Sequence, residues 1–119
     1  MTSIAPFLSV RRGSEALAIY KAAFAAEELH VIEDPGGAVV AQLSVDGAQF
    51  WISDESPEHG NFSPETLKGG TVRMILTVAD PDAAFARAVA PVTEDYGWRV
   101  GRVVDPYGHH WEIGHPLSA

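Results

Sequence analysis

The stretch DPYGHHWEIGH, residues 105–115, holds three of the chain's five histidines and one glutamate. Its first four residues, Asp-Pro-Tyr-Gly, match a type I turn, which favours Asp at its first position, Pro at its second and Gly at its fourth. We therefore expect Asp105 to serve this turn. The segments on either side, RVGRVV at 99–104 and HHWEIG at 109–114, predict the two strands of a β-hairpin.

This hairpin ends a series of elements that occurs twice along the chain. Each series predicts a strand, an amphipathic helix and three further strands, because short apolar runs bounded by turn-forming residues surround one run of helical periodicity. Ser14 and Asp80 are candidate N-caps of the two helices, and Asp46-Gly47 is a strong signal for a two-residue hairpin. The expected strands are residues 3–10, 28–33, 38–45, 48–53, 71–78, 91–97, 99–104 and 109–114, and the expected helices are residues 13–28 and 79–90.

The two series can be superimposed in sequence. A shift of 68 residues places Val10 on Val78. At the final hairpins, a shift of 61 residues places Phe50-Trp51-Ile52 on Trp111-Glu112-Ile113. The repeat predicts one α+β domain of two βαβββ modules, with module one at 1–53, a linker at 54–70 and module two at 71–119. The linker is polar and rich in Pro, Gly and Ser, which is typical of a connecting segment or of a loop over a site.

Charge and composition exclude several classes of protein. Eight Lys/Arg against sixteen Asp/Glu give a net charge of −8, and the cations are scattered, whereas a nucleic-acid binder needs a clustered basic surface. The absence of cysteine excludes disulfides, zinc ribbons and thiol nucleophiles. No apolar run approaches the ~18 residues of a membrane helix, and the first residues lack the pattern of a signal peptide. We expect a cytoplasmic protein without nucleic-acid or membrane partners.

Two βαβββ modules that end in DPYGHHWEIG resemble the vicinal oxygen chelate superfamily, which includes glyoxalase I, bleomycin-resistance proteins and extradiol dioxygenases. The segments FLSV…AIYKAAFAAEE, WISDESPEHG, TVADPDAAFARAV and YGWRVGRVVDPYGHHWEI look more narrowly like its PhnB-like branch. The resemblance covers nearly the whole chain, and its specific part is the final motif. It implies curved mixed sheets around a cavity that binds a small molecule, and a homodimer.

The resemblance also implies where a metal would bind. In the family's metalloenzymes, the first and last strand of each module supply one ligand each. The repeat carries these four positions onto Ala5, Trp51, Arg73 and Glu112. Only Glu112 can bind a divalent ion, and the cation of Arg73 would repel one, whereas a catalytic zinc site usually keeps three protein ligands. We therefore expect no metal or other cofactor. An atypical divalent-metal site that recruits His110 or His59 is the alternative.

Strand alternation tests whether these positions can face the implied cavity, because alternate side chains share one face of a strand. In residues 71–78, Arg73 and Ile75 lie on one face, and their apolar neighbours lie on the other. In the last strand, His110 and Glu112 share the cavity face, and the other two histidines of the motif face away. We therefore expect Arg73 and Glu112 to form a buried ion pair that replaces the metal as the polar anchor of the cavity.

These arguments give two sets of candidate residues. The candidate catalytic residues are Glu112, His110 and Arg73. The candidate residues of the ligand cavity are Ala5, Phe7, Trp51, Ile75, Trp98 and Arg99. Tyr96, Trp98 and Arg99 could line the cavity mouth or form a dimer interface, where Trp, Tyr and Arg are enriched, and the sequence leaves both open.

The sequence leaves three functions open. In the first, the chain binds a small oxygenated molecule without a metal. If it is then an enzyme, of lyase, isomerase or oxidoreductase type, Glu112 and His110 do acid–base work and Arg73 polarises an oxyanion. In the second, the chain sequesters a drug or metabolite without chemistry, as bleomycin-binding proteins do. In the third, it is a metal-dependent lyase or dioxygenase with an atypical site. The identity of the ligand is not encoded in any motif of the sequence.

Overall fold

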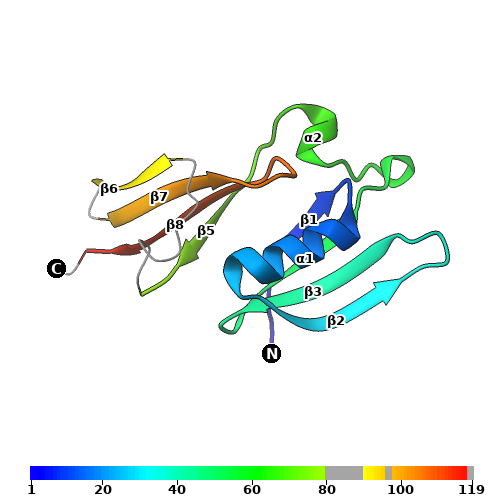
Figure 1. Ribbon diagram of the computed structural model, residues 1–119, viewed down its shortest axis with the longest axis horizontal. Helices are drawn as coiled ribbons and strands as arrows, with labels where there is room; N and C mark the ends of the chain where they lie inside the picture. Colours follow the sequence, from blue (N-terminus) through cyan, green and yellow to red (C-terminus); the bar gives the residue numbers. More distant parts are fainter. Residues whose placement is uncertain (80–89, 96–97, 118–119) are drawn as a thin grey trace. The chain divides into compact units, whose positions relative to one another are not determined.

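The chain folds into two compact units in the computed structural model, which describes residues 1–79, 90–95 and 98–117. Unit one spans Met1–Lys68 and unit two spans Gly69–Ala119. Each unit contains one four-stranded mixed sheet (Figure 1). None of the helices in the described part of the chain is long and apolar enough to span a membrane. The predicted α+β class of two sheet-forming modules is confirmed.

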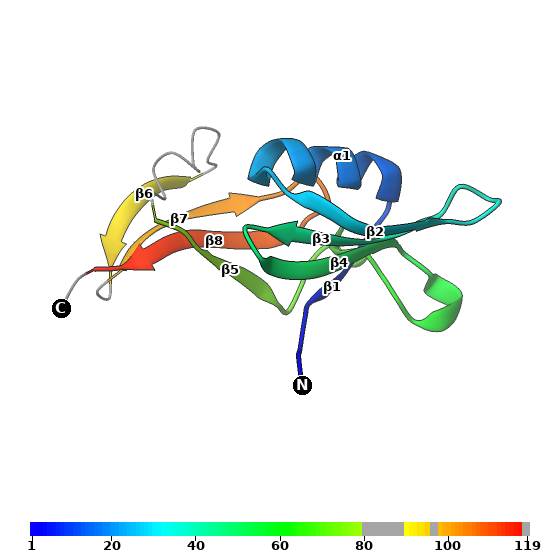
Figure 2. The ribbon, with the colours of Figure 1, turned by 90° about the horizontal axis from the view of Figure 1, so that it is seen from below.

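Unit one has the βαβββ order that the sequence predicts. Its elements are β1 (Phe7–Val10), α1 (Gly13–Phe24), β2 (Glu27–Glu33), β3 (Val39–Val45) and β4 (Ala48–Asp54). The sheet order is β1-β4-β3-β2, with β1 parallel to β4 and the other pairs antiparallel. The helix α1 lies across one face of this sheet (Figure 2), and the face turned away from α1 is called the open face of unit one below.

The core of unit one lies between α1 and the covered face of the sheet. Tyr20 of α1 meets Phe50 of β4 edge to face, with ring centroids 5.7 Å apart, a geometry that adds about 0.5–1.5 kcal/mol to the free energy of burial. Leu8 and Val10 of β1 are buried on this side of the sheet. Phe7, the first residue of β1, is exposed. The side chains of β1 therefore alternate between the two faces of the sheet, as expected of a strand.

The ends of the first two elements differ from prediction. The first strand begins at Phe7 rather than at residue 3, because Pro6 has no N–H to continue the ladder, so Ala5 lies outside the strand. The helix begins at Gly13, and Ser14 is not its N-cap. The carboxylate of Asp54, at the end of β4, instead accepts hydrogen bonds from the N–H groups of Gly13 at 3.0 Å and Val39 at 2.7 Å. The predicted helix 13–28 also ends early, at Phe24.

The predicted linker is folded onto unit one up to Lys68. It contains a 3-10 helix η1 (Pro57–His59) and the short helix α2 (Pro64–Leu67), whose N-cap is Ser63. The carboxylate of Glu55 accepts hydrogen bonds from the N–H of Ser63 and the hydroxyl of Thr66, both at 2.8 Å. These two hydrogen bonds lower the pKa of Glu55 below its usual range. Glu55 therefore fastens the segment to the end of β4.

The lowered pKa of Glu55 predicts a pH-dependent contribution to stability. A carboxylate whose folded pKa is depressed stabilises the fold above its unfolded pKa, and that contribution is lost as the pH falls through the folded pKa. Glu55→Gln should lower the free energy of unfolding by about 1 kcal/mol at pH 7. In urea denaturation, the difference from the parent chain should shrink as the pH falls from about 5 to 3. Thr66→Val keeps the carboxylate and should show a smaller pH-dependent difference. A difference that stays constant with pH would contradict this role.

Unit two repeats the sheet of unit one. Its strands are β5 (Arg73–Thr77), β6 (Ala90–Asp95), β7 (Trp98–Val104) and β8 (His110–Pro116). The order is β5-β8-β7-β6, with β5 parallel to β8. Phe7 pairs with Trp51 in unit one, and Ile75 pairs with Glu112 in unit two. These are the equivalences that the shifts of 68 and 61 predict, so the repeat is confirmed at the level of strand register.

The second predicted helix, 79–90, falls largely on residues 80–89, which lie outside the described residues. Its last residue, Ala90, is the first residue of β6, so that boundary is wrong. Asp80, the candidate N-cap, is also outside the described residues.

The turn between β7 and β8 is built around Asp105. The N–H of Gly108 donates to the carbonyl of Asp105 at 3.1 Å, as a type I turn requires. The Asp105 carboxylate accepts hydrogen bonds from the N–H groups of Tyr107 at 2.9 Å and His109 at 3.0 Å, and from the indole N–H of Trp111 at 2.9 Å. The prediction that Asp105 serves the turn is confirmed.

Candidate functional site

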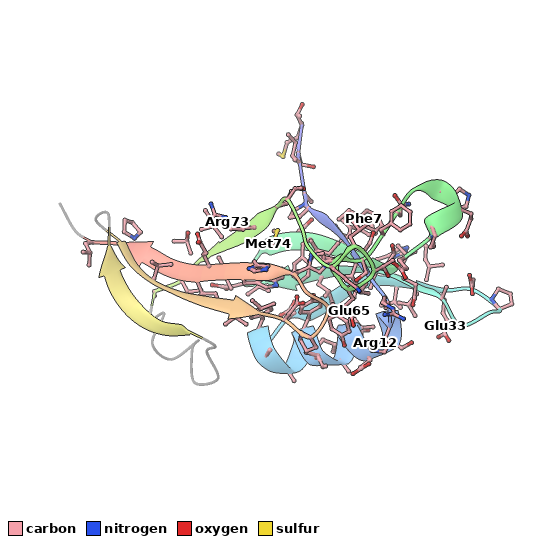
Figure 3. The ribbon with its side chains drawn as sticks, turned by 90° about the horizontal axis from the view of Figure 1, so that it is seen from above. Phe7, Arg12, Glu33, Glu65, Arg73 and Met74 are labelled. Carbon is pink, nitrogen blue, oxygen red and sulfur yellow. The ribbon has the colours of Figure 1, made fainter. Side chains whose placement is uncertain are left out.

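Arg73, His110 and Glu112 share the face of the unit two sheet that is turned away from the buried Trp111 and Ile113, and this face is called the open face of unit two. On β5, Arg73, Ile75 and Thr77 are exposed on one face, and Figure 3 shows Arg73 projecting from the strand. On β8, Trp111 and Ile113 are buried on the opposite side. The predicted alternation is therefore confirmed on both strands.

Arg73 and Glu112 form the predicted ion pair, with Arg73 Nη1 3.2 Å from Glu112 Oε1. The expectation that the pair is buried is wrong, because the Arg73 side chain is 66% exposed and that of Glu112 is 19% exposed. The reason lies in the sheet order: β5 is an edge strand, whereas β8 lies between β5 and β7. Exposed ion pairs contribute only about 0–1 kcal/mol to stability. The contribution of this pair to the free energy of unfolding is therefore small.

The contact between the two side chains is a single hydrogen bond, from Nη1 of Arg73 to Oε1 of Glu112. A guanidinium has five N–H donors in a planar fork, and it binds carboxylates and phosphates best through two of them. Within the described part of the chain, no other hydrogen bond of Arg73 is found. The carboxylate of Glu112 thus accepts from only one N–H group of the Arg73 guanidinium, and most of the Arg73 side chain is exposed.

His110 lies beside this pair. It is the register partner of Arg73 across the β5–β8 ladder, and it is exposed. The backbone of His109, by contrast, forms hydrogen bonds with Asp105: its N–H donates to the Asp105 carboxylate, and its carbonyl accepts from the Asp105 N–H. The side chain of His115 is outside the described residues. On the described residues, the histidines of the motif do not gather into one cluster.

The open face of unit one is aromatic and amide-rich. The rings of Phe7 and Trp51 stack with centroids 6.0 Å apart and an interplanar angle of 18°. Nε2 of Gln42 donates to Oε1 of Gln49 at 2.9 Å. Phe7 and Trp51 were predicted as cavity residues, and the amide pair was missed. Its signal was in the sequence, because the two-residue Asp46-Gly47 hairpin fixes the register of the two strands.

The remaining candidates are less well defined. Ala5 is exposed and lies ahead of β1. Trp98 and Arg99 belong to β7, opposite Pro116 and His115 in the ladder, but their side chains are outside the described residues, as is the whole of Tyr96. The choice between cavity mouth and dimer interface for these three residues stays a prediction.

The donor set does not fit the four-ligand metal site of the superfamily's metalloenzymes. Of the positions that the resemblance assigns to ligands, Ala5, Trp51 and Arg73 offer no suitable donor, and Glu112 is bound to Arg73. Among the described residues, no group of three or more His, Asp or Glu side chains is placed to hold a metal ion. His59 lies on η1 of unit one, where its Nδ1 is 2.7 Å from the hydroxyl of Ser56.

Comparison with known proteins identifies relatives over almost the whole chain. No family model matches the sequence. The uncharacterized protein Mb0911c of Mycobacterium bovis is 35% identical over 127 residues, which cover 97% of this chain and 84% of that protein. Among solved structures, the gene product At5g48480 of Arabidopsis thaliana is 27% identical with a TM-score of 0.70, covering 97% of this chain and 99% of that chain.

Other structural neighbours show the fold. A member of the glyoxalase/bleomycin resistance protein/dioxygenase superfamily from Sphaerobacter thermophilus has a TM-score of 0.70 at 19% identity, covering 97% of this chain and 98% of its own. TnmS3, an antibiotic binding protein from Streptomyces, has a TM-score of 0.69 at 22% identity, covering 97% of both chains. The fosfomycin resistance protein FosX from Listeria monocytogenes, solved with Mn(II) and sulfate, has a TM-score of 0.69 at 13% identity, covering 98% and 94%.

Proposed function

Because the chain belongs to the family of the mycobacterial protein Mb0911c and has the fold of the glyoxalase/bleomycin resistance/dioxygenase superfamily, we propose that it binds a small oxygenated molecule through Arg73. In this proposal the Arg73–Glu112 pair takes the place of a metal as the polar anchor. The observation that carries it is the one-point ion pair on the open face of unit two, with Nη1 of Arg73 3.2 Å from Glu112 Oε1.

The single hydrogen bond supports a ligand with a carboxylate or a similar oxyanion. Such a group can use two guanidinium donors at once, and bidentate pairs of this kind are the strong charge-assisted hydrogen bonds. Glu112 then plays two opposed parts: it positions the guanidinium, and it competes with the ligand for it. A ligand that engages Arg73 through two donors would replace the hydrogen bond that Arg73 donates to Glu112.

Enzymatic action would use the same residues. Glu112, beside Arg73, would accept a proton from the ligand, and His110, on the same open face, would give one back. Arg73 would stabilise negative charge that develops on a ligand oxygen. The chemistry required of the chain is thus proton transfer next to a stabilised oxyanion, which suits a lyase or an isomerase.

Sequestration without chemistry is the second candidate function. The stacked Phe7–Trp51 pair on unit one, in which Phe7 is exposed and Trp51 half-buried, favours it, because aromatic side chains can bind a flat ligand without any reacting group. TnmS3, which shares the fold, is described as an antibiotic binding protein.

A metal-dependent reaction with an atypical site is the third candidate. FosX was solved with Mn(II). In this chain, three of the four positions that the resemblance assigns to metal ligands, Ala5, Trp51 and Arg73, carry no suitable donor, which disfavours a metal-dependent reaction.

Two finer assignments complete the proposal. We assign the chain to the PhnB-like branch, on the strength of the segments quoted from its sequence, and we propose a cytoplasmic homodimer. The aromatic-Gly-Arg stretch at residues 96–99 would then serve either the cavity mouth or the dimer interface.

Binding of an oxyanion to Arg73 is tested with a matched pair of probes, pyruvate and its neutral amide. Arg73→Gln should weaken pyruvate binding about 10-fold, because it removes charge-assisted hydrogen bonds, and should leave the amide unaffected. Glu112→Gln should strengthen pyruvate binding by a few-fold, since it removes the competitor for the guanidinium. Isothermal titration calorimetry gives the affinities. Arg11→Gln, which removes an exposed arginine of unit one, is the control.

The same titrations separate the candidate functions. Equal pyruvate affinity for the parent chain and Arg73→Gln would overturn the oxyanion anchor. Product detected by proton NMR, and lost in Glu112→Gln, would favour the enzyme, whereas tight binding without turnover would favour sequestration. Stoichiometric nickel, zinc or iron in protein purified without an affinity tag, and lost in Glu112→Ala, would establish the metal-dependent alternative.

A further inference from the structure

The strand β2 lies at an edge of the unit one sheet and is exposed along its whole length. The sheet order places β3 on one side of β2 and, among the described strands, none on the other (Figure 1). All residues from Glu27 to Glu33 are exposed, because α1 packs on β3 and β4 instead. Three of them are large and apolar, namely Leu29, Val31 and Ile32, which are 44%, 40% and 54% exposed. An exposed, apolar strand edge is a place where another strand can pair.

The pairing of β2 with β3 shows which backbone groups point out of this edge. In an antiparallel ladder, opposed residues alternate between hydrogen-bonded and non-bonded pairs. Glu33 is opposite Val39, and the N–H of Val39 donates to Asp54, on the β4 side. Glu33 and Val39 therefore form a non-bonded pair. Val31, two residues before Glu33 in the same register, has the same orientation. The N–H and C=O groups of Val31 and Glu33 thus point away from β3.

The charges on this edge distinguish between possible partners. Four carboxylates flank the apolar residues, two at each end: Glu27, Glu28, Glu33 and Asp34. The strand itself contains one histidine, His30, and no lysine or arginine, and Lys21 of α1 binds Glu28 at 2.8 Å. A second copy of β2 would bring two such sets of carboxylates together, and like charges on adjacent strands are destabilising. A strand with cationic residues at both ends would instead be attracted.

We infer that β2 is a docking edge for an extended, basic segment of another protein, which adds to the unit one sheet as a further strand. The backbone of the segment bonds to Val31 and Glu33. Its central apolar side chains meet those of β2, and Lys or Arg at its ends lies next to the acidic residues. In this mode of recognition the backbone hydrogen bonds supply affinity and the side chains supply specificity. The inference goes beyond the proposed function, because neither Arg73 nor an open face takes part.

A short synthetic peptide is the probe: acetyl-Lys-Lys-Val-Thr-Val-Thr-Lys-Lys-amide with a fluorescent label, titrated by fluorescence anisotropy. The same peptide N-methylated at its central residues keeps every charge and side chain but lacks the backbone donors on both of its edges. The parent chain should bind the N-methylated peptide about 10-fold or more weakly, because backbone hydrogen bonds are lost. A peptide with Glu in place of every Lys should not bind, since its charge has the sign of the edge.

Two variants test the protein side of the contact. Val31→Pro leaves the β2–β3 ladder intact, because the N–H of Val31 points away from β3, and should weaken peptide binding about 10-fold or more. Glu27→Gln/Glu33→Gln should weaken binding several-fold at low salt, and this loss should shrink in about 0.5 M NaCl because exposed charges are screened. The matched control, Glu15→Gln/Glu58→Gln, removes two exposed carboxylates outside β2 and should bind like the parent chain. Circular dichroism verifies that each variant is folded.

Several results would overturn the inference. These are no binding of the peptide, equal affinity of the parent chain for the plain and N-methylated peptides, and unchanged binding by Val31→Pro or by Glu27→Gln/Glu33→Gln. A parent chain that is dimeric in analytical ultracentrifugation and becomes monomeric as Val31→Pro would assign the edge to a second copy, which also overturns it. Arg73→Gln should bind the peptide as the parent chain does, so the result is independent of the pyruvate titrations.

Discussion

Asp105→Ala should lower the free energy of unfolding by about 3–5 kcal/mol, more than any other single substitution proposed for this chain. The Asp105 side chain belongs to a residue only 8% exposed, and its carboxylate accepts hydrogen bonds from two backbone N–H groups and the indole of Trp111. Alanine leaves these donors without their acceptor inside the turn. Urea denaturation followed by circular dichroism measures the loss.

Two milder changes serve as controls. Asp105→Asn keeps one acceptor oxygen for the turn but places an NH2 group near the indole N–H, so its cost should fall between those of the parent chain and Asp105→Ala. Trp111→Phe removes the indole donor and keeps an aromatic ring, and the single lost hydrogen bond should account for about 1 kcal/mol of its cost. An Asp105→Ala variant as stable as the parent chain would show that the turn does not depend on this carboxylate.

Asp105 also determines where Glu112 points. Its bond to the indole fixes Trp111 on the buried side of β8, and alternation then directs Glu112 to the open face, where it meets Arg73. The DPYGHHWEIG segment therefore acts here through its turn aspartate and its tryptophan. Loss of Asp105 should weaken the Arg73 anchor even in molecules that remain folded.

The sequence predicted this geometry because strand alternation and the internal repeat are local properties. The alternation of apolar and polar residues predicted that Arg73 and Glu112 share one face of the sheet. The shifts of 68 and 61 residues predicted the register in which Ile75 pairs with Glu112. The exposure of the pair was mispredicted, since it depends on β5 being an edge strand. Strand order is set by contacts between distant segments, which no periodicity reveals.

The start of α1 shows the same limit. Ser14 has the residue type of an N-cap, yet the acceptor for the helix is the carboxylate of Asp54, 41 residues from Gly13 in sequence. Likewise, the polar segment after β4 looked like a connection, and Glu55 gives it structure by bonding across 8 and 11 residues. In both cases a carboxylate at or just after the end of β4, that of Asp54 or Glu55, accepts hydrogen bonds from residues distant in sequence. Local sequence patterns do not predict such partners.

Asp54→Ala should lower the free energy of unfolding by about 2–4 kcal/mol, because it leaves the N–H groups of Gly13 and Val39 without their acceptor. Gly13→Ala should also destabilise, for a different reason. A Cβ atom at Gly13 would meet the Asp54 carboxylate itself, so the clash and the hydrogen bonds involve the same group.

This shared carboxylate makes the two substitutions strongly non-additive. In the Asp54→Ala background that obstacle is gone, and the helix preference for alanine over glycine, about 1 kcal/mol in an interior and less at a first residue, offsets the remaining 3.3 Å approach to Val39 Cβ. Gly13→Ala should therefore be destabilising in the parent chain and close to neutral in the Asp54→Ala background. A double-mutant cycle by urea denaturation should give a coupling of at least about 1 kcal/mol. Additive effects would mean that Asp54 moves freely and does not fix the end of β4, where Trp51 and the open face of unit one are positioned.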